Sequence, residues 1–361
     1  MRAALATVLS GFALVPPLPL VDSLITPDAP PPRLPSGTWF GFNEDWSRHP
    51  ERIGLASRVG SATSRMPVSW AAVEKQQGHY SWHRYDRAYH GMVSRGIDPI
   101  LVPVDAPTWA RAPGPPCRPK RGCAHPPLPR FDSRWQAFIR NLAARYPLAI
   151  AVEPWNEPNL PNFWAGQAIN PSRYATLLKL AYGAVKRAVP RMAVISAGLS
   201  PRRGGQSDFV AYLRALYNQG FQAYSDGIGF HAYPRDPPWV ENTLSEVHDV
   251  AAVRDSFGDH GTGIWITETG VSTSGPTTGR AGVNGQARAL TGIYQALSLR
   301  GDVPVVIVHR LHDIGPARSD DRWDGPGVLR RNWRPKPAYC ALDQALDGQY
   351  KGGCPARPRE R

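Results

Sequence analysis

The sequence is poor in long apolar runs, although 361 residues with 42% apolar content suffice for one large core. Its one long apolar stretch, residues 3–15, follows Arg2 and is ended by Pro16, Pro17 and Asp22. That stretch is shorter than the about 20 residues that cross a bilayer. We therefore predict a secretory signal or uncleaved anchor over residues 1–25, an extracytoplasmic protein, and no other contact with a membrane.

Lysine is also scarce, so that the basic excess is almost entirely arginine. The formal net charge is +13 at pH 7, but the arginines are scattered and form no long basic run. A basic surface attracts polyanions, yet composition alone does not indicate a site. We therefore predict no nucleic-acid partner, whereas attraction to an acidic polysaccharide or cell-wall polymer stays open.

Cysteine is limited to four residues, which form two sequence-local pairs in segments rich in proline and glycine: Cys117 with Cys123, and Cys340 with Cys354. In a secreted chain such pairs predict two disulfides. A zinc site is the alternative, but the paired ligands of a tetrahedral cysteine site usually stand about two to four residues apart. Neither pair has that spacing.

The composition divides the chain into four parts. Residues 26–36 are rich in proline and predict an extended linker after the export segment. The folded domain is predicted over residues 37–347. Residues 348–361 are polar and rich in glycine and proline, and they predict a tail tied down by Cys354.

Short β-type runs alternate with longer helical stretches between these ends. The predicted strands cover residues 39–43, 62–68, 99–105, 149–156, 193–199, 227–233, 264–268 and 305–311. Apolar residues at three- and four-residue spacing predict helices over 135–146, 172–189, 209–219, 244–257 and 284–299. Eight such repeats predict a (β/α)8 TIM barrel of the α/β class. A doubly wound open sheet is the alternative, but no glycine-rich phosphate-binding loop follows any predicted strand.

Two carboxylates end two of these strands. Glu157 follows the fourth strand and Glu268 ends the seventh, 111 residues later. In a barrel the carboxyl ends of the strands converge on one pocket, so the two side chains are expected to face each other across it. Two opposed carboxyl groups are what cleavage of a glycosidic bond requires.

The residues around these carboxylates resemble a known family. Trp155-Asn156-Glu157-Pro158-Asn159 resembles the acid/base motif of clan A retaining glycoside hydrolases, and Thr267-Glu268 resembles their nucleophile. Residues 64–70, 77–82 and 85–86 are similar to the second-strand region of glycoside hydrolase family 39 and its relatives, and residues 336–339 are similar to the start of their last helix. The resemblance implies a secreted glycosidase in which Glu268 is the nucleophile, Glu157 the general acid/base and Arg65 a neighbour of the nucleophile.

The resemblance also implies residues that contact the sugar. Asn156 is similar to the residue that binds the sugar 2-hydroxyl, Tyr233 to an aromatic hydroxyl on the nucleophile, and His231 to a contact of sugar or nucleophile. Trp155 and Trp109 lie near predicted loop ends, where an indole suits the C–H face of a sugar or packs in the core. Glu153, on the same face as Glu157 but deeper, is expected to be a buried, paired charge.

No metal or cofactor is predicted, because His231 has no partner at the spacing of a metal site. One departure from the family concerns the eighth strand, which usually ends in a tryptophan that floors the subsite. Here the chain reads Val308-His309-Arg310-Leu311-His312 instead. We expect Arg310 and His312 to meet an acidic group, in agreement with the basic charge balance.

Two other functions are weighed against hydrolysis. A non-catalytic carbohydrate-binding barrel would normally have lost one carboxylate, and neither is lost here. A metal-dependent hydrolase would need a histidine cluster at the first strand, which reads Trp39-Phe40-Gly41-Phe42-Asn43. The expected partner is a polysaccharide or oligosaccharide, with its sugar and linkage left open.

Overall fold

The computed structural model describes residues 37–114, 122–276, 280–316 and 319–354. The predicted signal or anchor, the predicted linker and Cys117 lie outside these residues. Among the described residues, no helix is long and apolar enough to cross a membrane.

Eight parallel strands form one sheet in the order β5-β4-β3-β2-β1-β8-β7-β6. The pairing of β1 with both β2 and β8 curls the sheet. Isolated parallel bridges, Ile195 with Gly227 and Leu199 with Phe230, join the β5 edge to the β6 edge. The strands are β1 (Trp39–Asn43), β2 (Thr63–Ser69), β3 (Asp98–Val104), β4 (Ala151–Val152), β5 (Ala193–Val194), β6 (Ile228–Ala232), β7 (Ile264–Thr269) and β8 (Val305–His309).

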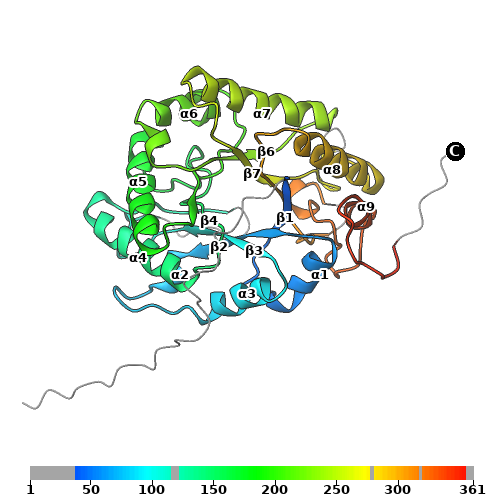
Figure 1. Cartoon of the computed structure of the whole chain (residues 1–361), viewed down its shortest axis with the longest axis horizontal. Coiled ribbons are helices and arrows are strands. Elements are labelled where there is room, and N and C mark those ends of the chain that lie inside the picture. Colours follow the sequence, from blue (N-terminus) through cyan, green and yellow to red (C-terminus); the bar gives the residue numbers. More distant parts are fainter. Residues whose placement is uncertain (1–36, 115–121, 277–279, 317–318, 355–361) are drawn as a thin grey trace, which may run out of the picture. The chain divides into compact units, whose positions relative to one another are not determined.

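Helices surround this sheet (Figure 1). They are α1 (Ile53–Arg58), α2 (Trp70–Val73), α3 (His83–Val93), α4 (Asp132–Arg145), α5 (Pro171–Ala188), α6 (Phe209–Tyr217), α7 (Trp239–Ser256), α8 (Val283–Ser298) and α9 (Pro337–Ala345). The sequence starts several of them locally. Asn170 accepts a hydrogen bond from Arg173 N at α5, and Asp208 accepts one from Ala211 N at α6, so each caps a free N–H group. The alternation of strand and helix is the predicted (β/α)8 barrel.

The core has two parts. The larger lies between the sheet and the helices and takes one side of each strand together with the apolar stripes of the helices. The smaller draws only on residues in or beside the strands, namely Ile100, Ile150, Ala151, Ile195, Trp265, Val305 and Ile307. Such a cluster fills the interior of a barrel, so the strands are buried on both faces and the site is confined to their ends.

Most predicted strands and helices agree with the structure to within a few residues, but two strands are shorter than predicted. The fourth covers only Ala151–Val152 rather than 149–156, because Trp155 and Glu157 have φ angles of +88° and +40°, which no extended strand contains. The fifth covers only Ala193–Val194 rather than 193–199. The chain therefore turns, rather than continuing straight, just before Glu157.

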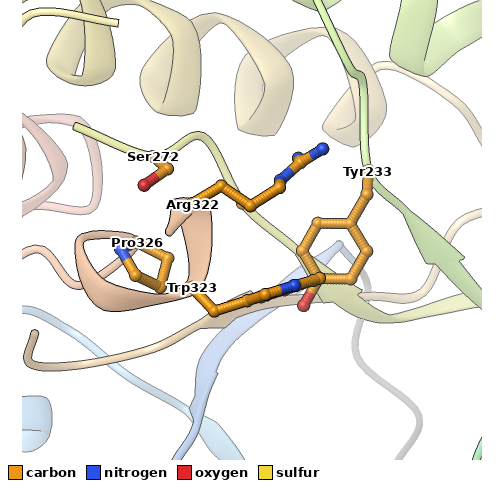
Figure 2. A pocket seen from close by; sticks show the side chains of 6 residues that line it. Tyr233, Ser272, Arg322, Trp323 and Pro326 are labelled. Atoms are coloured by element: carbon orange, nitrogen blue, oxygen red, sulfur yellow. The ribbon is translucent and has the colours of Figure 1, made fainter. Parts of the chain in front are cut away.

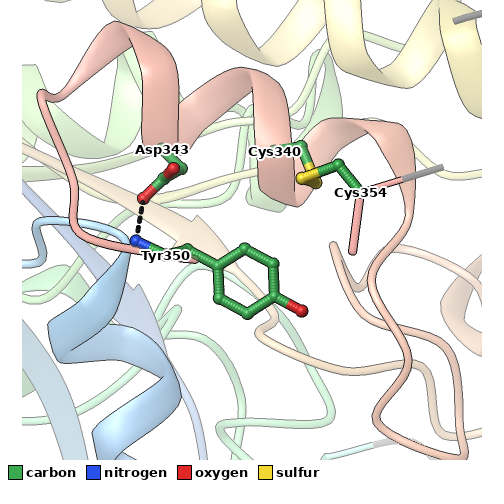
Figure 3. The surroundings of a disulfide bond; sticks show 4 residues. All are labelled: Cys340, Asp343, Tyr350 and Cys354. Atoms are coloured by element: carbon green, nitrogen blue, oxygen red, sulfur yellow. Dashed lines mark hydrogen bonds between the residues drawn. A yellow bond between two sulfur atoms is a disulfide. The ribbon is translucent and has the colours of Figure 1, made fainter. Parts of the chain in front are cut away.

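The predicted disulfide between Cys340 and Cys354 is present and ties the end of the described chain to α9 (Figure 3). A second contact joins this segment to α9, since Tyr350 N donates to Asp343 Oδ1 at 3.0 Å. The pairing of Cys117 with Cys123, like the domain bounds, stays a prediction.

Candidate active site

The two carboxylates singled out by the sequence lie together at the carboxyl ends of the strands. One oxygen of Glu157, one oxygen of Glu268 and a ring nitrogen of His231 all lie within 4.8 Å of one another. The side chains of Glu157 and Glu268 are 12% and 10% exposed. This upper bound is compatible with a nucleophile facing an acid/base at about 5–5.5 Å, and it is shorter than the about 6.5–9.5 Å that leaves room for an inverting water.

The backbone around Glu157 is tied to the segment that follows β5. Glu157 N donates to Gly198 O at 3.1 Å. Asn159 exchanges two hydrogen bonds with the Ser200 backbone, donating to its oxygen at 2.9 Å and accepting from its nitrogen at 3.1 Å. The turn that presents Glu157 is therefore held by contacts from a neighbouring strand end.

Arg65, on β2, connects the residues of the site. It donates to Glu153 through Nε at 2.8 Å and Nη2 at 3.0 Å, to Glu268 Oε1 at 2.5 Å and to Asn156 Oδ1 at 2.7 Å. Burial opposes its charge, but Glu153 and Glu268 outweigh that effect and raise the pKa of Arg65 above its ordinary value. Glu153 is fully buried and also accepts from Gly198 N and Thr267 Oγ1. The prediction of a buried, paired Glu153 is confirmed.

Glu268 receives hydrogen bonds from three side chains on different strands or strand ends. Besides Arg65, Asn43 Nδ2 donates to Oε1 at 2.6 Å, and Tyr233 Oη donates to Oε2 at 2.7 Å. Three donors, one of them the charged guanidinium of Arg65, hold the carboxylate in one orientation. The guanidinium also opposes a metal ion between Glu157, His231 and Glu268, because its positive charge already lies on Glu268.

Glu157 has the opposite environment. Burial raises its pKa from 4.5 to about 7, against the lowering effects of Arg65, a hydrogen bond with Ser200, and Arg202. His231 Nδ1 lies 2.9 Å from Glu157 Oε1. Burial lowers the pKa of His231 to about 4, so the ring is neutral near pH 7 and adds no positive charge that would ionise Glu157. The two carboxyl groups thus have different surroundings: Glu268 contacts a guanidinium, whereas Glu157 contacts a neutral imidazole.

His231 occupies space that only a glycine leaves open. A Cβ atom at Gly198 would lie 2.2 Å from the His231 ring and 2.6 Å from Thr267 Oγ1. Gly198 therefore allows His231 to lie beside Glu157, at a position where any side chain would displace it.

The predicted tryptophans are placed differently. Trp155 has no exposed surface, and its ring packs against Trp135 and Trp164 while Nε1 donates to Phe163 O. It therefore belongs to the core, and its assignment as a sugar contact is corrected. Trp109 is partly buried, and its Nε1 donates to Glu74 O at 3.1 Å. A sugar contact for Trp109 stays a prediction.

Arg310 and His312, which follow β8, bind an acidic side chain of the protein itself. Arg310 Nη2 and His312 Nδ1 bind the two oxygens of Glu44 at 2.7 and 3.0 Å. Glu44 follows β1 and is 1% exposed. Arg310 and His312 therefore do meet an acidic group, but that group is Glu44 of this chain and not part of a substrate.

Sequence reasoning missed three residues of the site. Asn43 and His309 end β1 and β8, and Asn43 Nδ2 lies 3.0 Å from His309 Nδ1. Trp323, from the segment after β8, lies with its ring centroid 6.1 Å from that of His309. Asn43 and His309 could have been predicted as site residues, because each is a polar residue at the end of a barrel strand. No sequence pattern indicates where the loop places Trp323.

No family model and no curated protein matches the sequence. Solved structures do resemble it. A family 39 glycoside hydrolase from Bacteroides cellulosilyticus WH2 is similar with a TM-score of 0.64 and 20% identity, over 85% of this chain and 63% of that one. A GH39 β-xylosidase from Caulobacter crescentus is similar with a TM-score of 0.59 and 20% identity, over 86% of this chain and 70% of that one. GH5_18 from Streptomyces cattleya is similar with a TM-score of 0.63 and 16% identity, over 90% of this chain and 83% of that one.

The fold is a (β/α)8 barrel of the kind that these enzymes have. The chain spans about 63% of the length of the Bacteroides protein, and the identities are too low to carry activity from one chain to another. The barrel places Glu157 and Glu268 at the end of the sheet where such folds hold their active sites.

The Glu44 cluster gives a prediction about stability. Burial raises the pKa of Glu44, but Arg310 and His312 outweigh that effect and lower it to about 2. The Glu44→Gln variant is expected to lose roughly 3 kcal/mol of unfolding free energy at pH 7, because Arg310 loses its buried partner. A carboxyl group whose pKa is lower in the folded state stabilises the fold above pH 4.5. That contribution is lost as the pH falls toward 2. Urea unfolding of both proteins should therefore show the difference shrinking across this range.

The control is Asp45→Asn, which removes a carboxylate from the partly exposed ion pair with Arg48. It should change the unfolding free energy by less than about 0.5 kcal/mol. A Glu44→Gln loss that did not depend on pH would contradict the electrostatic explanation.

Proposed function

We propose that this chain is a retaining glycoside hydrolase in which Glu268 is the nucleophile and Glu157 the general acid/base. One observation carries the proposal: two carboxyl groups within 4.8 Å of each other have opposite environments. Glu268 accepts from Arg65, Asn43 and Tyr233, whereas burial raises the pKa of Glu157 to about 7. Two carboxyl groups in different environments are how such an enzyme divides its two roles.

In the first step, ionised Glu268 attacks the anomeric carbon as the glycosidic C–O bond breaks. Protonated Glu157 donates its proton to the leaving oxygen, so the departing group leaves as a neutral alcohol. The sugar remains bonded to Glu268 as a glycosyl ester. Tyr233 and Asn43 hold the carboxylate for this attack without competing as nucleophiles.

In the second step, Glu157, now ionised, takes a proton from water as the water attacks the same carbon and the ester bond breaks. Two inversions restore the original anomeric configuration. Arg65 holds the Asn156 amide oxygen at 2.7 Å, which leaves the amide nitrogen to donate to the sugar 2-hydroxyl. That interaction strengthens in the transition state.

The similar solved structures support a substrate class, and the disulfide supports a cellular location. Structures that share the fold include a family 39 glycoside hydrolase and a β-xylosidase. We infer a β-linked plant or microbial glycan as substrate, without a cofactor. The disulfide Cys340–Cys354 supports export to an oxidising compartment.

The test of the mechanism is the anomeric configuration of the first product. We would incubate the full chain with a panel of aryl glycosides and polysaccharides and record product release by NMR. Release with retention supports the proposal, whereas initial inversion would refute a nucleophilic Glu268. Glycan binding without release from any substrate would favour the carbohydrate-binding barrel.

The pH profile gives a second prediction. Because Glu157 must be protonated, kcat/KM should fall about tenfold per pH unit above about pH 7. A Glu157→Ala variant should lose this limb and should retain most activity only toward 2,4-dinitrophenyl glycosides, whose leaving group departs without a proton. A basic limb that persisted in Glu157→Ala would assign the acid to another residue.

A further inference from the structure

A small surface hollow lies beside Tyr233, which contacts the proposed nucleophile Glu268. Its lining is Tyr233, Gly270, Ser272, Arg322, Trp323 and Pro326 (Figure 2). Tyr233 forms the wall shared with the catalytic residues, since its hydroxyl donates to Glu268 Oε2 at 2.7 Å. A group that contacts the exposed surface of Trp323 and Arg322 therefore lies beside Tyr233, the residue that holds Glu268.

Trp323 supplies an indole at the place where β8 has no tryptophan. It is 42% exposed, and its ring centroid lies 5.4 Å from that of Tyr233 and 6.1 Å from that of His309, the last residue of β8. An exposed indole with an ordered setting is suited to the C–H face of a sugar. The loop after β8 thus brings an indole to the end of a strand that has no tryptophan of its own.

Arg322 adds a positive charge to the same wall. Figure 2 shows its side chain and that of Trp323 extending from the loop in the direction of Tyr233. The Arg322 guanidinium carbon lies 5.5 Å from the centroid of the Trp323 ring. Among the residues that the structure describes, no carboxylate lies within 4.0 Å of this guanidinium, in contrast to Arg310, which binds Glu44.

One carboxyl group, Glu246 on α7, is attracted to Arg322 from a greater distance. Burial raises the pKa of Glu246 to about 8, although Arg203 and Arg322 act to lower it. Near pH 7 this group is mostly protonated and does not neutralise Arg322. Arg322 is the charged residue of the pocket lining, which contains no carboxylate.

The loop that carries Arg322 and Trp323 is anchored on both sides. Asp321 Oδ1 accepts from Trp323 N at 3.0 Å, and Ser274 Oγ donates to Asp321 O at 2.8 Å. Lys336, which is 1% exposed, binds Asp313 at 2.8 Å and Gly325 O at 3.2 Å. These contacts hold the backbone that carries Arg322 and Trp323, so less loop ordering is needed when a ligand binds.

We propose that Trp323 and Arg322 form a subsite for an anionic sugar, with the indole under the ring of a uronic acid unit and the guanidinium on its carboxylate. A planar guanidinium matches a carboxylate with two parallel hydrogen bonds. The subsite makes an acidic, uronate-containing glycan the substrate class. This inference rests on the proposed glycosidase function, which it deepens.

Binding is tested without turnover in the Glu268→Gln variant of the full chain. The two probes are a β-1,4-linked hexamer of glucuronic acid and cellohexaose, which has hydroxymethyl groups in place of the carboxylates. We expect calorimetry to show roughly ten- to hundredfold tighter binding of the uronate, as for hydrogen bonds between charged groups. Adding Arg322→Gln should abolish this preference, and adding Trp323→Ala should weaken both probes while Trp323→Phe retains them.

The matched control is Arg331→Gln, which removes the same charge from an exposed position of the same loop outside the pocket lining. Equal losses of uronate affinity in Arg322→Gln and Arg331→Gln would mean that net charge alone attracts the uronate. That result would overturn the subsite. Equal binding of both probes, or binding of neither, would overturn it too. Thermal unfolding confirms that each variant is folded.

Hydrolysis by the unmodified protein separates the two proposals. Cleavage of neutral glycosides with retention, and no uronate preference, refutes the subsite and leaves the glycosidase function standing. Uronate binding that depends on Arg322, without cleavage of any glycan in the panel, refutes the function and leaves the binding site.

Discussion

Glu268→Gln is expected to lower kcat/KM by a factor on the order of 10⁵, the scale of losing a covalent nucleophile. The amide that replaces the carboxylate keeps its size and still bonds with Tyr233 or Asn43, but it cannot form the glycosyl ester. Steady-state kinetics on the best substrate of the panel measures the loss. Circular dichroism and thermal unfolding should show an intact fold.

Azide distinguishes a missing nucleophile from a damaged site. In Glu268→Gly the deleted side chain leaves room for a small anion, which is expected to attack the anomeric carbon and give a glycosyl azide of inverted configuration. The control, Glu241→Gln, changes the same chemical group at an exposed position of α7 and should keep full activity. If azide restored no activity and the product of a slow residual reaction were still retained, another nucleophile would have to be sought.

Arg65→Met should be the most destabilising single change in the site. Its side chain is 2% exposed and is bound to Glu153, which is fully buried, and to Glu268. Removing the cation leaves two carboxylates without compensation, at an expected cost of about 3–5 kcal/mol in unfolding free energy. Urea unfolding at pH 7 measures this cost, and activity should fall as well because Glu268 loses the donor at 2.5 Å.

The cost should depend on pH in a known direction. Burial without a compensating cation favours the protonated form of a carboxyl group, so the folded variant binds protons that the unfolded chain releases. The variant therefore recovers stability relative to the unmodified protein as the pH falls below about 5, and loses it as the pH rises. Arg48→Met, which removes an exposed arginine from a surface pair, serves as the control. A deficit that was constant with pH would indicate lost packing instead.

The barrel is predictable from sequence because its signals are local. Buried strands such as β8, Val305–His309, are short runs of β-branched residues, and helices such as α5 begin with Asn170 and Pro171, which favour a helix start whatever the rest of the chain does. The prediction was wrong about the length of the fourth strand. There the left-handed backbone at Trp155 and Glu157 depends on contacts with Gly198 and Ser200, more than 40 residues away.

The sequence by itself determined the alternation of strands and helices and the positions of Glu157 and Glu268 at strand ends, since both follow from residue type and spacing along the chain. Only the tertiary structure decided which side chains surround them. Arg310 and His312 bind Glu44 across 266 and 268 positions, and Asn43 reaches Glu268 across 225. It also decided that Trp155 is buried and that Trp323 is exposed near β8. Burial, charge pairing and loop placement are properties of the closed barrel, because they depend on distances in space that neighbouring residues in the sequence do not determine.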